Sequence, residues 1–527
     1  MFKIKNWIKK RRRADLRSYM RGYIHLDKNN NTEYIDCLKR RLSETTIENK
    51  KFNSASKNPE EICLQQFLVY RLLDKNFNIE ILKSLKKKSA LNLNLPLSWR
   101  LLLEDEGFKV NTSKNKLNWL SFQLKWFIYG TLTGLKEVTK SFNNNLVNIE
   151  YVYFYDLSPK NFPISENDTE SKNIVRWFVE SAFSKGIKKI AHSAETNLKS
   201  ISGIGLSKTS GPLPSLVGTK RFLFIFWLIK KFFQGILYSN QRILFREKIF
   251  LKILKLSSKK SLPVSYYFHN AWSIFKPLWT YEVEKMGIDV ILYFYSTNIY
   301  TMIEKGKDEK LFFNPWLFSR WKKILAWNKS QELFINQKSS INSKIYKVGP
   351  IPFYSSKGIR DFKKNINNPK IVVFDVQPFK KLFWYAYAPH CDYYNFKNSK
   401  QFLSDINLLA KKIGGTVYIK RKRNTEVVSN SYIKLISRFV KIDKWIEIDP
   451  ELDVFRLTEI LNPDISINRP FTSTAHVTKS YNIPSIYYDP SKKLDLPKYS
   501  FIEIELINKY SKLIQWTKKN IKHKNLT

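Results

Sequence analysis

Short β-favouring runs alternate with helical patterns along most of this 527-residue chain, and this alternation constrains the fold more than any other feature. A first series of strand patterns lies at 149–155, 187–191, 264–268, 289–295, 323–327 and 344–348. A second series lies at 370–375, 416–419, 445–448, 464–467 and 483–488. Strands that alternate with helices are typical of parallel sheets covered by helices. The predicted fold class is therefore α/β.

The length of the chain predicts more than one domain, because a single core rarely extends over 527 residues. A polar linker at 365–368 separates the two series of strands. We predict the following division: a mainly helical N-terminal region at 1–145, a Rossmann-like domain at 146–360 with a helical insertion at about 220–255, a second Rossmann-like domain at 366–498, and a C-terminal helix and tail at 499–527. The last helix could cross back onto the first domain.

Residues 464–490 are predicted to form a strand, a polar loop, a short helix and another strand. Pro470 bars continuation of the first strand, and Thr472, Ser473 and Thr474 stand where a helix N-cap is expected. Open α/β sheets bind ligands at the carboxyl ends of their strands, where a helix N-terminus stabilises phosphate. Two interpretations follow: a phosphate site, or an ordinary helix cap without a ligand.

The net charge of +46, from 91 Lys and Arg against 45 Asp and Glu, predicts anionic partners. Nucleic acid, acidic lipids and phosphorylated small molecules all qualify, although solvated Asn/Lys-rich faces also account for much of the excess. The three cysteines have neither metal-binding spacing nor a paired framework, which fits a reducing cytoplasm. Residues 1–13 are basic without an apolar core, so we expect no secretion signal there.

Two aromatic segments are candidates for amphipathic helices, at 119–135 and 222–238. The second is 17 residues long with Lys230 and Lys231 at its centre. A membrane-spanning helix needs about 20 apolar residues and tolerates central lysine poorly. We therefore predict no transmembrane span, and expect 222–238 either to lie along a membrane surface or to pack inside the protein.

The motif Pro470-Phe471-Thr472-Ser473 resembles that of bacterial polysaccharide-biosynthesis proteins of the GT-B glycosyltransferase class. Residues 348–351 (Val-Gly-Pro-Ile), 374–378 (Phe-Asp-Val-Gln-Pro) and 484–490 (Pro-Ser-Ile-Tyr-Tyr-Asp-Pro) support the resemblance, which covers roughly 150–490. It implies a GT-B-like fold with two Rossmann-like domains facing a cleft, and transfer of a sugar from a nucleotide-sugar donor. More distantly, the second half resembles sialyl-, polysialyl- and Kdo-transferases. Their His-Pro motif is replaced here by 419–423 (Ile-Lys-Arg-Lys-Arg), which argues against a CMP-linked donor.

In this layout the second domain holds the nucleotide. Ser473 and Thr474, beside Thr472, are expected to bind the phosphate, and Arg469 and Lys420 to add positive charge. Lys420 also fits a solvated sheet edge. Two residues at the end of the domain's first strand, Asp375 and Gln377, are further candidates for nucleotide or sugar contacts. Asp489 is expected either to contact the ribose or to form a turn that closes the cleft.

The catalytic base is expected from the first domain. The candidates are Asp156, His192 and His269, each at the carboxyl end of a predicted strand. Alternatively, Asp156 caps a turn and the histidines satisfy loop carbonyls. No paired acidic motif demands Mg²⁺, so we expect a metal-independent enzyme without a cofactor, for which the nucleotide-sugar is a substrate.

The favoured function is a cytoplasmic glycosyltransferase that acts on a surface-polysaccharide or lipid-linked acceptor, a glycan or glycolipid, at the anionic inner membrane face. The first alternative is a teichoic-acid-type glycerophosphotransferase, for which only His390 and His476 are available in the second domain. The second is a non-catalytic basic nucleic-acid-binding protein. No ribonucleoprotein motif, zinc finger or helix-turn-helix supports specific nucleic-acid binding, and nothing indicates an oligomeric state.

Overall fold

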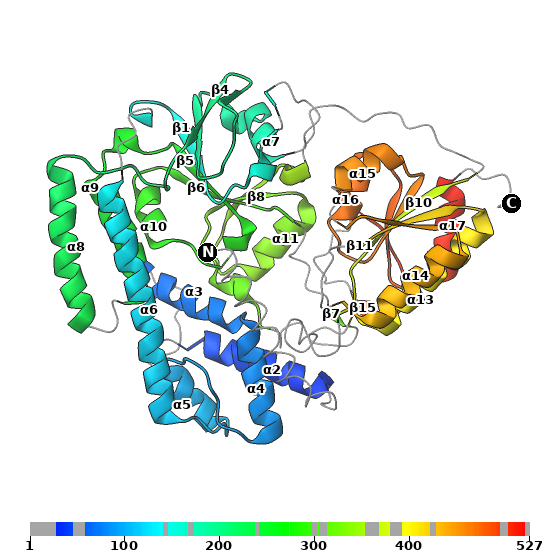
Figure 1. Cartoon of the computed structure of the whole chain (residues 1–527), viewed down its shortest axis with the longest axis horizontal. Helices are drawn as coiled ribbons and strands as arrows, with labels where there is room; N and C mark the ends of the chain where they lie inside the picture. The colour runs from blue at the N-terminus through cyan, green and yellow to red at the C-terminus, as the bar shows by residue number, and fades with distance from the viewer. Residues whose placement is uncertain are drawn as a thin grey trace.

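A group of helices, an eight-stranded sheet and a six-stranded sheet follow one another along the chain (Figure 1). The structure is a computed structural model. It describes residues 28–45, 58–140, 146–163, 165–166, 173–237, 242–272, 274–296, 303–304, 313–353, 368–379, 393–421, 428–450, 452, 454–495 and 504–521. The basic segment 1–13, His390 and residues 422–423 of the basic run lie outside these ranges.

The N-terminal region is helical where it is described, as predicted. Its helices are α2 (Lys28–Ser43), α3 (Pro59–Leu72), α4 (Lys75–Lys87), α5 (Leu97–Asp105) and α6 (Thr112–Thr139). Local sequence explains several helix starts: Asn58 accepts a hydrogen bond from the N–H of Glu60 and precedes Pro59, and Asn111 caps α6. A core that includes the buried Trp99 holds α2 to α5 together.

The first domain is built on a sheet with the strand order β3-β4-β2-β1-β5-β6-β8-β9. Its strands are β1 (Tyr151–Phe154), β2 (Lys189–His192), β3 (Ser200–Ile201), β4 (Ile204–Lys208), β5 (Ser265–His269), β6 (Asp289–Tyr293), β8 (Lys323–Ala326) and β9 (Lys344–Lys347). All neighbours are parallel except the β3–β4 pair. The order runs outward from β1 on one side and from β5 on the other, which is the Rossmann pattern with its switch point between β1 and β5.

The short β3–β4 hairpin is not among the strands predicted from the sequence. Gly203, with a φ of 83°, makes the tight turn between the two strands. Glycine and serine dominate this segment and have low β propensity. Pairing with β2 therefore creates a strand that local pattern does not predict.

Helices cover both faces of this sheet: α7 (Ile174–Glu180), α8 (Thr219–Leu237), α9 (Phe245–Leu256), α10 (Leu278–Lys285) and α11 (Lys329–Lys338). The predicted helical insertion at about 220–255 is the pair α8 and α9. Helix α8 lies beside α6 at the outer side of the molecule (Figure 1). Of the described helices, none combines the length and apolar character that a bilayer crossing requires.

The second domain has the same topology, with the order β12-β11-β10-β13-β14-β16 and parallel neighbours throughout. Its strands are β10 (Lys370–Asp375), β11 (Thr416–Arg421), β12 (Trp445–Ile448), β13 (Ile465–Asn468), β14 (Ser485–Tyr488) and β16 (Leu506–Ile507). Its helices are α13 (Phe396–Ile413), α14 (Asn430–Ile442), α15 (Val454–Leu461), α16 (Thr474–Ser480) and α17 (Tyr510–Asn520).

The C-terminal segment differs from the expectation in two ways. Strand β16 lies beyond residue 498, within a segment expected to be helical, and extends the second sheet. Helix α17 packs its buried Leu513 on the core of the second domain instead of crossing to the first. Apolar residues at helical spacing predict that a helix has a buried face but do not identify its partner.

Among the described residues, the two domains contact each other through a pair of short strands and through a pair of aromatic rings. The short strands β7 (Ile303–Glu304) and β15 (Leu494–Asp495) pair antiparallel. The ring of Trp327, just after β8, lies 6.0 Å from the ring of His476 on α16, in an edge-to-face arrangement. The carboxyl edge of the first sheet therefore contacts the helix that follows the Pro-Phe-Thr-Ser motif.

Candidate active site

Each Rossmann-like domain has a pair of ionisable residues at its topological switch point. In the first domain Phe154 is in register with Tyr267, so Asp156 and His269 occupy neighbouring positions two residues further along β1 and β5. In the second domain Phe374 is in register with Asn468, so Asp375 and Arg469 occupy neighbouring positions one residue further along. Open α/β sheets bind ligands outside the carboxyl ends of their strands at this point. The two pairs are therefore the first candidates for catalytic or ligand-binding residues.

Asp156 is exposed and has a left-handed backbone conformation with a φ of 55°, which aspartate tolerates better than most residues. Its Oδ2 accepts a hydrogen bond from Nε1 of Trp272 at 3.0 Å. Its carboxylate is thereby held at the end of the sheet. Trp272 is not among the site residues predicted from the sequence. Its position, three residues after the end of β5, could have indicated that it lies near the site.

His269 is half-buried, and its Nδ1 accepts a hydrogen bond from the N–H of Ala271 at 3.2 Å. A neutral imidazole that accepts at Nδ1 carries its proton on Nε2. Burial lowers the pKa of His269, and the nearby carboxylate of Asp156 opposes that effect, so the ring is mostly neutral near pH 7. This geometry favours Asp156 as the proton acceptor and His269 as a hydrogen-bond donor.

His192 lies elsewhere on the sheet. It is the last residue of β2, its side chain is fully buried, and its ring packs 4.7 Å from the ring of Phe162. Burial lowers the pKa of His192 to about 4. It is not among the residues that line the cavity beside Asp156 and His269, and its role as a base stays a prediction.

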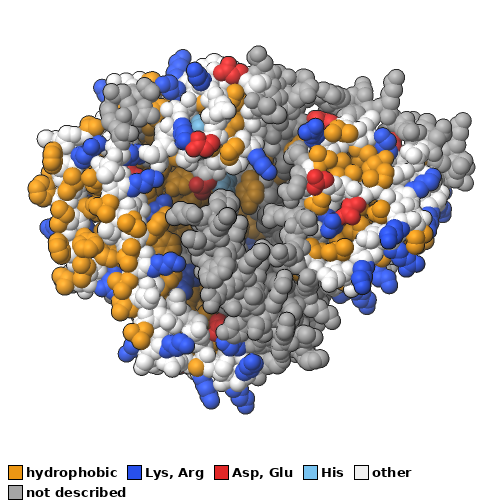
Figure 2. All heavy atoms as spheres, viewed as in Figure 1, with side chains coloured by type: hydrophobic (Ala, Val, Ile, Leu, Met, Phe, Trp, Pro, Cys, Tyr) orange, Lys and Arg blue, Asp and Glu red, His pale blue; other side chains and the backbone are white. Residues whose placement is uncertain are grey.

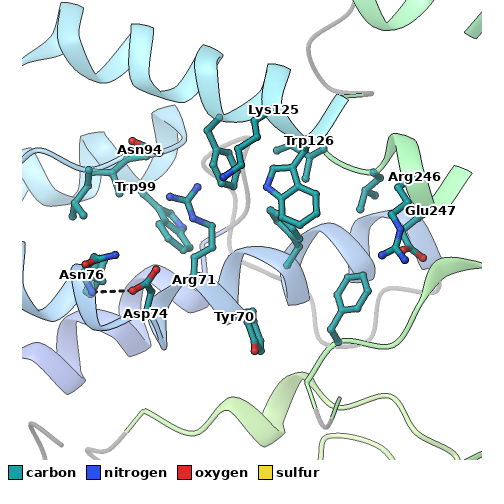
Figure 3. Close-up of a pocket in the computed structure, with 18 of the residues that line it drawn as sticks. Tyr70, Arg71, Asp74, Asn76, Asn94, Trp99, Lys125, Trp126, Arg246 and Glu247 are labelled. Carbon is teal, nitrogen blue, oxygen red and sulfur yellow. Dashed lines mark hydrogen bonds between the residues drawn. The ribbon is translucent and has the colours of Figure 1, made fainter. Parts of the chain in front are cut away.

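Asp156 and His269 line a cavity of about 1050 Å³ between the first domain and helices α3 to α6. Many of its walls are aromatic: Phe67, Tyr70, Phe77, Trp99, Phe122, Trp126, Trp272 and Phe275. Three cationic side chains, Arg71, Lys125 and Arg246, also line it. In Figure 3, Arg71 lies close to Trp99 and Lys125, while Arg246 and Glu247 lie at the other end of the view. The N-terminal helices had weak motifs, and no sequence signal marked Arg71 or Trp99 as site residues.

In the second domain the predicted hydroxyl cluster precedes α16, and Ser473 is the N-cap residue. Thr472 Oγ1 donates to the carbonyl of Arg469 at 2.9 Å, and Thr474 Oγ1 donates to Oδ1 of Asn468 at 3.1 Å. All three hydroxyl residues are half-buried. They therefore form one ordered loop at the carboxyl end of β13, where the sequence placed them.

Phe471, the aromatic residue of the motif, has a left-handed backbone with a φ of 66°. A bulky residue in this region is strained, and such strain is concentrated at functional sites. Its ring packs 5.8 Å from the ring of Tyr487 on β14, which helps to hold the loop in place.

The two cations expected at the phosphate are engaged within the domain. Arg469 is fully buried, its Nε lies 3.4 Å from Oδ1 of Asp375, and its guanidinium packs against the ring of Tyr393 at 4.6 Å. Asp375 also accepts a hydrogen bond from the hydroxyl of Tyr432 at 2.8 Å, and burial raises its pKa to about 6. Lys420 is buried, and its Nζ donates to the carbonyl of Pro450 at 2.7 Å. Direct phosphate contacts by these residues stay predictions.

The remaining predicted contacts are also inside the second domain. Gln377 is buried just beyond β10. Asp489 is buried and accepts hydrogen bonds from the N–H groups of Ser491 and Leu494, at 3.1 and 3.3 Å. It therefore holds the turn that leads to β15, and both closure of a cleft by this turn and a ribose contact stay predictions.

Two Rossmann-like domains in one chain, preceded by a helical region, define an α/β protein of the GT-B-like class. The sequence model of the family described as polysaccharide biosynthesis PFTS motif protein matches residues 227–517, more than half of the chain. The chain belongs to this family, and the match includes Pro470-Phe471-Thr472-Ser473.

Comparison with solved structures gives similarities at low sequence identity. Staphylococcus aureus MnaA, solved with UDP, is 8% identical with a TM-score of 0.35, and the alignment covers 72% of this chain and 89% of that one. A Methanocaldococcus jannaschii UDP-GlcNAc 2-epimerase is 11% identical with a TM-score of 0.32, over 72% and 94% of the two chains. A UGT transferase from Siraitia grosvenorii, solved with UDP, is 9% identical with a TM-score of 0.35, over 70% and 91%. No curated protein sequence matches the chain.

Proposed function

We propose that this protein is a glycosyltransferase that moves a sugar from a nucleotide-sugar donor to an acceptor used in polysaccharide synthesis. The observation that carries the proposal is the pair of Asp156 and His269, on neighbouring parallel strands at the first switch point and on the wall of a cavity. Membership of a polysaccharide biosynthesis family supports the same class of reaction.

The proposed chemistry is a displacement at the anomeric carbon of the donor sugar. An acceptor hydroxyl attacks that carbon, the bond between the sugar and the nucleotide phosphate breaks, and the hydroxyl proton passes to the carboxylate of Asp156. His269, with its proton on Nε2, donates a hydrogen bond that orients the acceptor. The charge that develops on the leaving phosphate requires hydrogen-bond donors and positive potential.

The second domain is the proposed donor site. Ser473 and Thr474 lie at the start of α16, beyond the carboxyl end of β13, where open α/β sheets bind ligands. The contact between Trp327 and His476 holds this helix against the carboxyl edge of the first sheet, which supports a reaction between the two domains. Nucleotide contacts by Thr472, Asp375, Gln377 and Asp489 belong to the same proposal. The proposed mechanism requires no metal ion.

The acceptor is proposed to be reached from an anionic membrane surface at the cytoplasmic face. Six exposed apolar residues form one stripe on α6: Leu117, Leu120, Leu124, Ile128, Leu132 and Leu135. Six more form a stripe on α8: Phe222, Phe226, Ile229, Phe233, Ile236 and Leu237. We call these twelve residues the α6–α8 apolar surface. Figure 2 shows hydrophobic side chains gathered over both helices, with Lys and Arg among them.

Close packing makes the two stripes one surface. The ring of Phe127 on α6 stacks 5.5 Å from the ring of Phe232 on α8, and a Cβ added at Gly134 of α6 would lie 2.8 Å from Cδ1 of Leu228. Exposed lysines accompany the stripes: Lys116, Lys125, Lys136, Lys220 and Lys230. An apolar helical face with flanking lysines is suited to the interface of an anionic bilayer. One face of α8 is buried and the other is exposed, so part of the segment packs inside the protein, and contact of the exposed face with a membrane belongs to this proposal.

The test of the proposed function has two parts. Thermal-shift measurements with UDP, GDP, CDP and CMP are expected to find one nucleotide that stabilises the protein, with much of the shift lost in Ser473→Ala. Sugar transfer with the matching donor is expected to fall by about 10²- to 10⁴-fold in Asp156→Asn. Asp105→Asn, an exposed carboxylate at the end of α5, is the matched control. The proposal is abandoned if no nucleotide stabilises the protein.

A further inference from the structure

A single turn after β5 contacts both residues of the first switch-point pair. It is the short helical turn η7 (Asn270–Trp272). The N–H of Ala271 donates a hydrogen bond to Nδ1 of His269 at 3.2 Å, and Nε1 of Trp272 donates to Oδ2 of Asp156 at 3.0 Å. The orientation of the imidazole and of the carboxylate therefore depends on the same short segment.

Hydrogen bonds to the sheet and to the core fix the backbone of this turn. Oδ1 of Asn270 accepts a hydrogen bond from the N–H of Tyr295, just beyond β6, at 3.1 Å. The carbonyl of Trp272 accepts from Nε1 of Trp321 at 3.2 Å, and Trp321 is fully buried. Groups that are locked in this way by their neighbours hold a functional side chain in one geometry.

The indole ring of Trp272 is held as well. The rings of Tyr155 and Phe268 meet it edge-to-face, with ring centres 5.0 and 6.0 Å away. Trp272 is half-buried and lines the cavity together with Asp156, so their hydrogen bond lies at the cavity wall and not in the core. An exposed carboxylate without such a partner changes its rotamer freely. The indole therefore restricts a side chain that the backbone alone leaves mobile.

The hydrogen bond distinguishes the two oxygens of the carboxylate. Nε1 of Trp272 occupies Oδ2 of Asp156, and Oδ1 accepts no hydrogen bond from the described residues. An indole has an N–H donor and no acceptor, so Trp272 cannot take up a proton itself. Proton transfer requires the base to lie within hydrogen-bond reach of the attacking hydroxyl, and a displacement of about 1 Å can lower the rate about a hundredfold.

We propose that Trp272 is a positioning residue for the proposed reaction: its indole N–H holds Oδ2 of Asp156, so that Oδ1 faces the cavity and accepts the proton of the attacking hydroxyl. This inference rests on the proposed function and adds a residue to its machinery. Trp272 exchanges no proton with the substrate and acts through Asp156. The competing explanation is that Trp272 only packs among the aromatic rings around β5.

Nuclear magnetic resonance of the full chain with isotope-labelled tryptophan tests the contact without any substrate. The indole N–H signal that disappears in Trp272→Phe belongs to Trp272. This signal is expected to move in Asp156→Asn, because the charged acceptor is lost, and to stay in place in Asp105→Asn. An indole signal that does not move in Asp156→Asn would overturn the proposal. If Trp272→Phe does not fold, the comparison of wild type, Asp156→Asn and Asp105→Asn decides the point.

A double-mutant cycle tests the role in turnover, measured as release of nucleotide from UDP-glucose or UDP-N-acetylglucosamine, or from the same sugars on the nucleotide that stabilises the protein, with water as the acceptor. Trp272→Phe is expected to lower kcat by about tenfold or more, the loss expected for a hydrogen bond to a charged group. The KM for the donor is expected to change by less than about twofold, because the proposed donor site lies in the second domain. Trp516→Phe, a half-buried tryptophan of α17, is the matched control and is expected to keep full activity.

The same substitution in the Asp156→Asn protein distinguishes positioning from packing. Trp272→Phe is expected to lower kcat there by less than about twofold, since no carboxylate remains to be oriented. Equal losses in both backgrounds, or an unchanged kcat in the single variant, would overturn the proposal. Turnover that depends on Asp156 but not on Trp272 therefore rejects this inference and leaves the proposed function intact, whereas a protein that no nucleotide stabilises rejects the proposed function itself.

Discussion

Nε of Arg469 lies 3.4 Å from Oδ1 of Asp375, and neither side chain is exposed to solvent. These residues stand at the switch point of the second sheet, as Asp156 and His269 do in the first. One topological position therefore serves two purposes. In the second domain the pair is sealed in the core, and in the first the pair faces a cavity.

The buried pair makes the first prediction. Arg469→Ala is expected to lower the free energy of unfolding by about 3–5 kcal/mol, because it leaves the carboxylate of Asp375 buried without its cation. Urea unfolding measures this loss. The double variant Arg469→Met with Asp375→Asn is expected to recover part of the stability, since it removes both charges. A stable Arg469→Ala protein that no longer binds nucleotide would instead place Arg469 at the phosphate.

The division of roles between Asp156 and His269 makes the second prediction. His269→Gln is expected to lower kcat less than Asp156→Asn does, by about tenfold against about 10²- to 10⁴-fold, because only Asp156 accepts the proton. Asparagine tolerates the left-handed backbone at position 156, so the Asp156→Asn protein should fold normally. Kinetics of sugar transfer by both variants decide the point. A larger loss for His269→Gln would assign the base to the imidazole.

The buried side chain of His192 predicts a loss of stability in acid. Burial lowers the pKa of His192 to about 4, whereas the unfolded side chain titrates near about 6.5. The unfolded chain therefore binds a proton first, and stability falls as the pH drops from about 6.5 to about 4, by on the order of 1–3 kcal/mol. Asp375, with its pKa raised to about 6, has the opposite effect between about 3.8 and 6.

His192→Phe isolates the histidine from these other groups. The variant keeps an aromatic ring beside Phe162, and its stability is expected to change less between pH 7 and pH 4 than that of the wild type. Thermal unfolding across this range provides the measurement. If the stability of the two proteins changes with pH in the same way, the pKa of His192 is the same in the folded and the unfolded chain.

The α6–α8 apolar surface predicts binding to anionic vesicles. The double variant Phe226→Ser with Phe233→Ser is expected to weaken sedimentation with phosphatidylglycerol vesicles by at least about tenfold. Each Phe side chain that enters the lipid contributes about 2 kcal/mol to binding, although both rings are exposed in the free protein. The stability of the variant is expected to stay near that of the wild type, since both rings are exposed. The matched control, Ile446→Ser with Ile460→Ser, alters exposed residues of the second domain. Equal losses in both pairs would contradict a specific surface.

Packing between α6 and α8 predicts that Gly235 tolerates no side chain. A Cβ at this position would lie 2.2 Å from Cε2 of the Phe127 ring, so Gly235→Ala must displace either the ring or the helix. We expect a loss of about 1–3 kcal/mol in the free energy of unfolding, together with weaker vesicle binding as the two stripes separate. Gly107→Ala controls for the general cost of replacing a glycine, because an added Cβ there meets no atom. Because φ at position 107 is 83°, Gly107→Ala is itself strained and loses some stability. The control is therefore judged by its vesicle binding, which is expected to equal that of the wild type.

Metal removal provides a further prediction. The proposed chemistry relies on hydroxyls and backbone N–H groups at α16 for the leaving phosphate. Sugar transfer is therefore expected to continue in the presence of excess EDTA. Loss of activity with EDTA, restored by Mg²⁺ or Mn²⁺, would show that a divalent ion assists the leaving group.

Local pattern was sufficient for much of the fold. The strand over 445–448 coincides with β12, and 370–375 with β10, because short runs of β-branched and aromatic residues between turn residues favour strands. The two-residue strand β16 has too little sequence to produce such a pattern and forms because β14 offers it an open edge. The position of Ser473 before α16 was likewise visible, since a hydroxyl cluster after Pro470 favours a helix start.

Sequence alone thus determined where most of the longer strands and helices form and which motif links the chain to its family, because backbone preference and side-chain periodicity are local properties. The tertiary structure decided the use of each residue. It turned Arg469 inward onto Asp375, and it brought Arg71 and Trp99 from distant helices to the cavity beside Asp156. Such contacts depend on which faces pack together, and residues far apart in the chain carry no local record of that choice.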